Sequence, residues 1–124
     1  MLTKGPISPG AHGTLDYVLA AVLILTPFIA GFDSDTASAI LIVAGVHQLQ
    51  MALFTAWPPG VLALISPSVH GVIDYLLAVA LIAAPFGIAF HDETATACFI
   101  ALGVCGFGFV AATRFVPDPT RSKS

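Results

Sequence analysis

Residues 7–17 read ISPGAHGTLDY, and residues 65–75 read ISPSVHGVIDY. The two stretches belong to a longer tandem repeat, because a shift of 58 positions aligns residues 7–59 with residues 65–117 without a gap. In that alignment, 22 of the 53 positions are identical. A shared apolar composition would match Ala, Leu, Ile and Val by chance, but it would not match the histidines, aspartates, prolines and glycines seen here. We therefore predict two copies of one structural unit.

Each unit contains two apolar stretches that are long enough to cross a bilayer, whose hydrocarbon core needs about 20 helical residues. The four stretches are Leu15–Phe32, Thr36–Ala56, Val72–Phe90 and Thr94–Thr113. Only 9% of the residues are charged, against about 25% in soluble domains. Backbone groups in lipid must pair within their own segment, and the apolar residues are continuous, so helices are expected. We predict an all-α membrane protein with four transmembrane helices, formed by residues 1–124 as a single domain.

The two units are expected to run parallel, because each contains an even number of spans. A pseudo-two-fold axis along the membrane normal would then relate them. Within each unit, Ser8-Pro9 and Ser66-Pro67 are typical of a helix N-cap followed by proline in the first turn. Pro27 and Pro85 are expected to lie inside the odd-numbered helices and to kink them. Glycines in the even-numbered spans, such as Gly45 and Gly103, favour close helix packing.

Charge predicts the orientation of the chain in the membrane. The basic residues lie at the two ends of the chain, at Lys4, Arg114, Arg121 and Lys123. The two opposite connections carry acidic residues and one histidine, which are Asp33, Asp35, His91, Asp92 and Glu93. The positive-inside rule then places both termini in the cytoplasm of a multi-pass inner-membrane protein. The uncharged middle connection begins with Trp57, which suits a membrane interface, and His91 is expected to be solvated.

A family resemblance covers both units. Thr26-Pro27-Phe28 and Ala84-Pro85-Phe86 each close an apolar helix before a short polar loop and a second, glycine-containing helix. This element resembles the Ser-Pro-Trp element of the SPW-repeat family, with Pro-Phe in place of Pro-Trp in both copies. The resemblance implies a small prokaryotic integral membrane protein, and it implies no particular biochemical activity.

The leading functional candidates are the repeated pairs His12/Asp16 and His70/Asp74, because polar groups within membrane helices are often functional. Histidine and aspartate four residues apart share one helix face and can hydrogen-bond. If the repeats are related by a two-fold axis, the two pairs face each other near the cytoplasmic end. We also expect these side chains to point into the bundle, with Asp16 held by His12, by Tyr75 or by the opposite pair.

Three interpretations of the pairs remain open. In the first, the protein is structural or accessory, and the pairs are polar contacts that hold the helices together. In the second, two symmetric histidines bind a haem axially or hold one metal ion together with the aspartates. In the third, the pairs form part of a small proton or ion pathway. Tyr17 and Tyr75, next to the aspartates, are supporting residues that also suit an interfacial belt.

A second polar group lies in the second span, at His47, Gln48 and Gln50. The other unit has Cys105, Gly106 and Gly108 at the equivalent positions. The glutamines could fill the space that the glycines leave and hydrogen-bond across helices. Alternatively, His47 could complete an asymmetric site with the two His/Asp pairs.

Several classes of function are disfavoured. The sequence has no P-loop, GxGxxG, HExxH or nucleophile-elbow motif, so we expect no enzyme activity. There is no basic stripe for nucleic acid. Cys98 and Cys105 lack metal-site spacing and are expected to be buried, inert thiols. The expected partners are the lipid bilayer and, as candidates, a second copy of the chain or another membrane protein.

Overall fold

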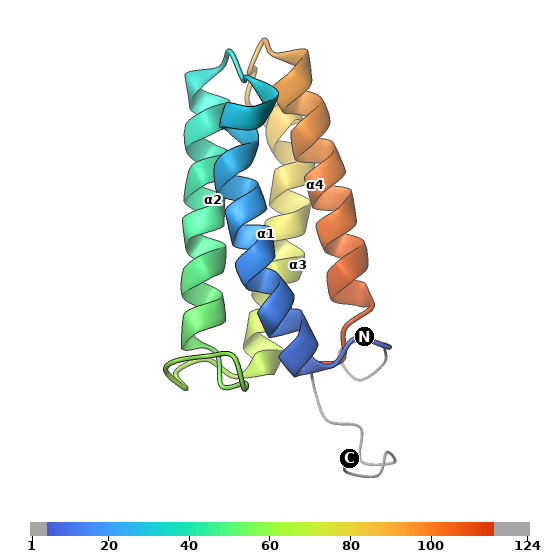
Figure 1. The fold of residues 1–124 in the computed structure, drawn as a ribbon. Coiled ribbons are helices and arrows are strands. Elements are labelled where there is room, and N and C mark those ends of the chain that lie inside the picture. Colours follow the sequence, from blue (N-terminus) through green and yellow to red (C-terminus); the bar gives the residue numbers. More distant parts are fainter. Residues whose placement is uncertain (1–4, 116–124) are drawn as a thin grey trace.

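The computed structural model describes residues 5–115 and contains four long helices (Figure 1). They are α1 (Pro9–Ala30), α2 (Asp35–Phe54), α3 (Pro67–Gly87) and α4 (Glu93–Ala111). Each is long and apolar enough to cross a membrane, which confirms the predicted fold class. The α1–α2 and α3–α4 turns lie at one end of the bundle, here called the turn end. The α2–α3 connection and both ends of the described chain lie at the other, here called the terminal end (Figure 1).

Side-chain caps set the first residue of every helix. An oxygen of each cap residue accepts a hydrogen bond from the backbone N–H three residues later, at Ser8, Ser34, Ser66 and Asp92. Proline follows Ser8 and Ser66, as predicted, because the first turn of a helix does not need the missing N–H. For this reason α1 and α3 begin well before the apolar spans that hydropathy alone delimits. Gly31 ends α1 with a φ of 69°, in the left-handed region that favours glycine.

The helices pack as two pairs, α1 with α2 and α3 with α4. Each pair contacts closely at one glycine. A Cβ on Gly45 would lie 2.6 Å from Ile24 Cγ1, and a Cβ on Gly103 would lie 2.6 Å from Ile82 Cγ1. The predicted packing role of these two glycines is therefore confirmed. Gly108, in contrast, faces open space.

Two short backbone contacts link the repeats at the terminal end. Ile7 forms a parallel bridge with Thr113, and Thr55 forms a parallel bridge with Ile65. A shift of 58 residues converts Ile7 into Ile65 and Thr55 into Thr113, so the two bridges are equivalent. Each one joins the start of one repeat to the end of the other, as a pseudo-two-fold arrangement requires.

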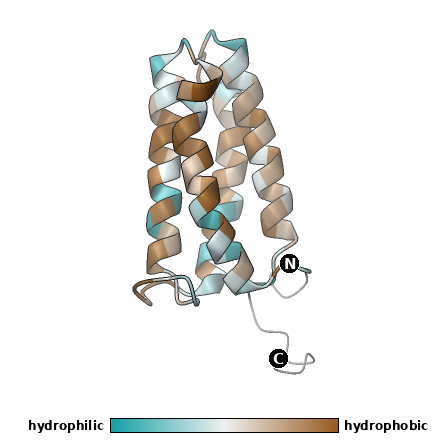
Figure 2. Ribbon diagram, viewed as in Figure 1, coloured by the Kyte–Doolittle hydropathy of each residue, from teal (hydrophilic) through white to brown (hydrophobic). Residues whose placement is uncertain are grey.

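The interior of the turn half is apolar. It contains one cluster of buried hydrophobic side chains, formed by Leu23, Ala37, Leu41, Ala44, Leu81, Phe90, Ala95 and Phe99. Large hydrophobic side chains also cover the outside of the bundle, and Phe28, Ile29 and Phe86 are more than 70% exposed. Hydrophilic residues gather at the tips of the turns and in the terminal half (Figure 2). This distribution is expected for a helical bundle whose central part is surrounded by lipid.

The orientation of the bundle in the membrane stays a prediction. Lys4, Arg121 and Lys123, on which it depends, lie outside the described residues. Arg114 is described, and its guanidinium donates to the carbonyl oxygen of Gly5 at 3.3 Å.

Candidate functional site

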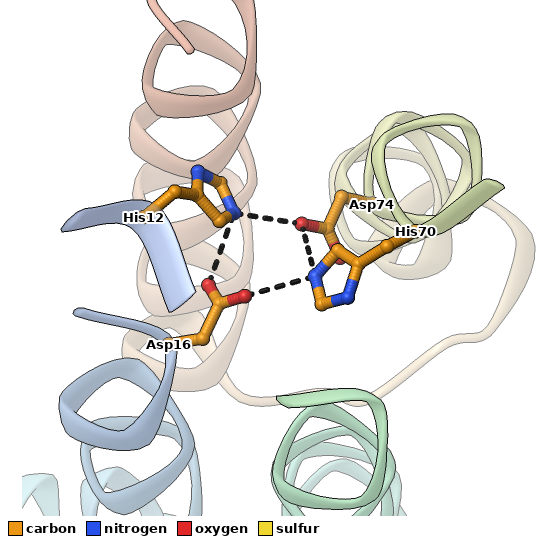
Figure 3. A group of neighbouring side chains, drawn as sticks. All are labelled: His12, Asp16, His70 and Asp74. Atoms are coloured by element: carbon orange, nitrogen blue, oxygen red, sulfur yellow. Dashed lines mark hydrogen bonds and ion pairs between the residues drawn. The ribbon is translucent and has the colours of Figure 1, made fainter. Parts of the chain in front are cut away.

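The two His/Asp pairs meet inside the bundle near the terminal end (Figure 3). His12 and Asp16 project from the first turns of α1, and His70 and Asp74 project from the first turns of α3. The side chains of His12, Asp16 and His70 are fully buried, and Asp74 is 5% exposed. The prediction that all four point into the bundle is therefore confirmed.

Four short contacts join these residues in a closed ring in which histidine and aspartate alternate (Figure 3). His12 Nε2 lies 3.2 Å from Asp16 Oδ1 and 3.0 Å from Asp74 Oδ2. His70 Nε2 lies 2.9 Å from Asp16 Oδ2 and 3.0 Å from the same Asp74 oxygen. We call this group the His/Asp ring. Each histidine contacts the aspartate of its own helix and that of the other repeat.

The contacts of the ring are short, but most are poorly directed as hydrogen bonds. The contact from His12 Nε2 to Asp74 Oδ2 has hydrogen-bond geometry. In contrast, both oxygens of Asp16, Oδ1 of Asp74 and Nε2 of His70 are buried without a hydrogen-bond partner among residues 5–115. Such orphaned polar atoms are rare in protein interiors, because each one costs desolvation free energy. The ring is thus crowded with polar atoms that the described residues do not satisfy.

The outer nitrogen of each histidine contacts a threonine of the other repeat. His12 Nδ1 lies 2.8 Å from Thr113 Oγ1, and His70 Nδ1 lies 2.8 Å from Thr55 Oγ1. These threonines were not among the residues predicted from the sequence. A signal was nevertheless present, because Thr55 and Thr113 are an identical pair in the 58-residue alignment.

The threonines determine the histidine tautomer. The hydroxyl of Thr55 donates its hydrogen to the carbonyl oxygen of Met51, and that of Thr113 donates to the carbonyl oxygen of Phe109. A hydroxyl has a single hydrogen, so each threonine oxygen can only accept from the histidine. Nδ1 of both rings therefore carries a hydrogen. A neutral ring in this tautomer presents the lone pair of Nε2 to the aspartates.

Aromatic side chains close the ring toward the terminal end. The ring centroid of Trp57 lies 4.3 Å from that of His70, and the centroid of Phe115 lies 4.8 Å from that of His12. Trp57 and Phe115 are equivalent in the repeat. The glycine that follows each histidine makes room for them, because a Cβ on Gly13 or Gly71 would lie less than 3.0 Å from the indole or the phenyl ring.

The polar residues predicted in the second span differ in burial. Gln48 is buried and lines a small cavity beside Asp16 and Asp74. Gln50 is exposed, and His47 is half-buried in a groove between α2 and α3. The group of metal-ligating side chains that the structure brings together contains the four residues of the ring and does not include His47.

Tyr17 and Tyr75, which were predicted to support the aspartates, make different contacts. Tyr17 donates to the carbonyl oxygen of Pro59 at 2.6 Å, which fastens α1 to the α2–α3 connection. The hydroxyl of Tyr75 has no hydrogen-bond partner among the described residues. Tyr75 therefore does not hold Asp16, whose carboxylate contacts His12 and His70 instead. His91 is exposed, as predicted.

The prediction of buried thiols is wrong for Cys105, which is exposed, and Cys98 is half-buried. Both lie on α4, whose outer face would contact lipid. An apolar helix of a small bundle exposes much of its surface to the bilayer, so an apolar environment does not require burial inside the protein.

The fold and the ring define a multi-pass helical membrane protein in which two tandem repeats enclose a buried polar centre. The model of the SPW repeat domain matches residues 10–115. The chain therefore belongs to the SPW repeat family, as the Pro-Phe elements predicted. Comparison with curated proteins and with solved structures gave no match.

Proposed function

We propose that the protein is a metal-binding membrane protein, in which the His/Asp ring holds one divalent transition-metal ion between the two repeats. The observation that carries this proposal is that the hydroxyl oxygens of Thr55 and Thr113 accept a hydrogen bond from Nδ1 of the two histidines. In its neutral form, each imidazole then directs its Nε2 lone pair toward the two carboxylates of a buried site. Ligand atoms from all four side chains lie within 4.8 Å of one another, which is the spacing of atoms that share one ion.

The charge of the ring supports a cation. Two ionised aspartates with neutral histidines would place two negative charges in a membrane bundle, and each buried unpaired charge costs several kcal/mol. One divalent ion makes the centre neutral and gives the orphaned carboxylate oxygens a partner. Two imidazole nitrogens and two carboxylate oxygens suit Zn²⁺ and neighbouring first-row metals. An Nδ1–H bonded to an oxygen is also the usual support of a histidine that binds metal.

Neither a haem nor a transmembrane pathway agrees with the geometry as well. Both Nε2 atoms contact the same oxygen of Asp74, so a carboxylate occupies the space that a porphyrin would need. On the other side of the ring, the interior of the turn half is filled by hydrophobic side chains such as Leu23, Leu41 and Phe99. Within residues 5–115, this apolar core interrupts any polar route across the bundle.

The competing candidate is a ring without metal, in which both histidines are protonated and the four side chains act as an ionic contact between the repeats. The hydrogen bond from His12 to Asp74 favours it. Both candidates describe a binding or structural role, and we propose no catalytic activity for either.

Metal content separates the two. The protein would be purified in detergent, stripped with a chelator, reloaded with Zn²⁺ and measured by elemental analysis. We expect one ion per chain in the wild type and a loss of that ion in His12→Ala, His70→Ala and Asp16→Asn. His47→Ala is the matched control, because it removes a membrane-embedded histidine outside the ring, and it should keep the ion.

A second readout uses Trp57, the single tryptophan of the sequence. The indole of Trp57 lies next to His70. Cu²⁺ bound to the His/Asp ring should therefore quench tryptophan fluorescence in the wild type and in His47→Ala. A wild-type protein that binds no metal by either measurement would leave the metal-free ionic contact as the function of the ring.

A further inference from the structure

The α2–α3 connection has an apolar outer surface. Within residues 5–115, Val61, Leu62 and Leu64 are 71%, 50% and 73% exposed, and Ala63 between them is exposed as well. Trp57, in contrast, is buried, and its indole N–H donates to a backbone carbonyl oxygen of α2. The side chains of the connection that face outward together are therefore those of residues 61–64, here called the loop segment.

The sequence around the loop segment is uncharged. Asp, Glu, Lys and Arg do not occur between Asp35 and Asp74, so most of α2, the connection and the start of α3 carry no formal charge that favours bulk water. The chain that follows α4, at the corresponding end of the second repeat, contains Asp118, Arg121 and Lys123. The repeat therefore does not itself require an apolar sequence at this place.

The backbone of the connection is largely hydrogen-bonded to itself and to the end of α2. Seven N–H groups donate to carbonyl oxygens within residues 53–65, and they belong to Ala56, Trp57, Gly60, Val61, Leu62, Leu64 and Ile65. The carbonyl oxygens of Leu53 and Phe54 accept two of these bonds each, at 2.7–3.0 Å. Carbonyl groups in the last turn of a helix otherwise depend on water or a cap. Pairing of this kind removes the main obstacle to placing irregular backbone in an apolar medium.

The surroundings of the loop segment indicate lipid as its partner. The connection lies at the foot of α2 at the terminal end (Figure 1). Val69 and Val72, in the first turns of α3, are also exposed, so the apolar surface continues from the connection onto the outside of the bundle. A stable protein interface needs roughly 800 Å² from each partner, which four loop residues do not supply by themselves. Contact with lipid has no such threshold.

We propose that the loop segment inserts into the bilayer at the boundary between the headgroups and the acyl chains, on the terminal side of the membrane. An irregular segment is not expected in the hydrocarbon core, and this boundary is the depth at which exposed apolar side chains of a surface element are buried. The same connection holds Trp57 against His70, so the element that covers this side of the His/Asp ring is itself anchored in lipid. The proposal does not depend on a metal ion in the ring.

The first test measures the reactivity of single cysteines in the full chain, reconstituted in phosphatidylcholine vesicles. Leu62→Cys and Leu64→Cys would be made in a background in which Cys98 and Cys105 are replaced by alanine. A thiol reacts as the thiolate, which apolar surroundings disfavour. We therefore expect alkylation by N-ethylmaleimide to be slower by about tenfold or more than in Asp35→Cys, which changes an exposed residue at the start of α2. Equal rates would overturn the proposal.

The second test identifies what covers the loop segment, with nitroxide spin labels on the same cysteines. Power saturation compares collisions with oxygen, which concentrates in lipid, and with a water-soluble nickel chelate. We expect oxygen to dominate for Leu62→Cys and Leu64→Cys, as for Leu76→Cys, whose native side chain is 65% exposed on α3. The nickel chelate should dominate for Asp35→Cys. A nickel-dominated signal in the loop segment would place it in water, and protection from both reagents would mean that protein covers it. Either result would overturn the proposal.

Discussion

At the terminal end of the bundle, the contacts of the His/Asp ring and of its threonines join the repeats in equivalent pairs, whereas at the turn end a single carboxylate accepts the hydrogen bonds between the repeats. His12 and His70 have equivalent partners in the ring and in Thr113 and Thr55. At the turn end, Asp92 Oδ2 accepts from the backbone N–H groups of Asp33 at 2.7 Å and Ser34 at 3.0 Å.

The equivalent of Asp92 in the first repeat is Ser34, whose hydroxyl only caps its own helix by accepting from Ala37. In the ring, each repeat supplies one histidine and one aspartate. At the turn end, the carboxylate of Asp92 accepts from the backbone of its own equivalent, Ser34, and one carboxylate is enough because backbone N–H groups are the donors.

The largest effect is expected in the ring. His12→Ala or His70→Ala leaves buried carboxylates without a partner, and each should lower the free energy of unfolding by about 3–5 kcal/mol. The two losses should be alike, because the two histidines have equivalent contacts. The measurement is unfolding in detergent, followed by circular dichroism.

His91→Ala, in an exposed turn residue, serves as the control and should change stability little. A large loss in one ring variant and none in the other would show that the two halves of the ring are not equivalent in solution.

An intermediate effect is expected for the threonines. Thr55→Val or Thr113→Val leaves one histidine N–H without an acceptor and should cost about 1–3 kcal/mol of stability. It should also weaken binding of Zn²⁺ by about 10–100-fold, the usual effect of removing such a support. Competition with a chromogenic chelator measures the affinity.

Thr14→Val is the matched control for both threonines. The hydroxyl of Thr14 also donates to a backbone carbonyl four residues earlier, but it contacts no histidine. A loss of Zn²⁺ affinity as large in Thr14→Val as in Thr55→Val would contradict the role of the threonines in orienting the rings.

The smallest effect is expected at the turn end, and it depends on pH. Hydrogen bonds from the backbone N–H groups of Ala95, Ser34 and Asp33 hold the pKa of Asp92 below its ordinary value of 3.8. A carboxyl with a lowered pKa adds stability above its unfolded-state pKa, and this contribution disappears as the pH falls through the folded-state value. Thermal unfolding should therefore show wild type and Asp92→Asn differing at neutral pH and converging in acid.

Ser34→Ala sharpens this comparison. It removes a neutral cap worth about 1 kcal/mol, and its effect should not vary over the same acidic range. A difference between wild type and Asp92→Asn that grows as the pH falls would contradict the stabilising role of the Asp92 charge.

Much of the site was predictable because the repeat makes its geometry visible in the sequence. Each unit carries a histidine and an aspartate one helical turn apart. These identical His/Asp pairs must face each other if a two-fold axis relates the units. The penalty for a carboxylate in lipid then requires that they point inward. The distinction between His47 and Gln48 was not predictable, because adjacent residues on a helix point about 100° apart and only the packing of α2 decides which one enters the bundle.

The sequence by itself determined the number of helices, their pairing into two parallel repeats, their capped starts and the presence of a buried polar centre. These features follow from local properties, namely continuous apolar length, cap residues and the 58-residue offset. Only the tertiary structure decided that Thr55 and Thr113 orient the histidines, that the ring closes across the repeats, and that Gln48 shares a cavity with Gly106. Those features depend on contacts between residues distant in the chain, whose distances and directions are set by how the helices pack.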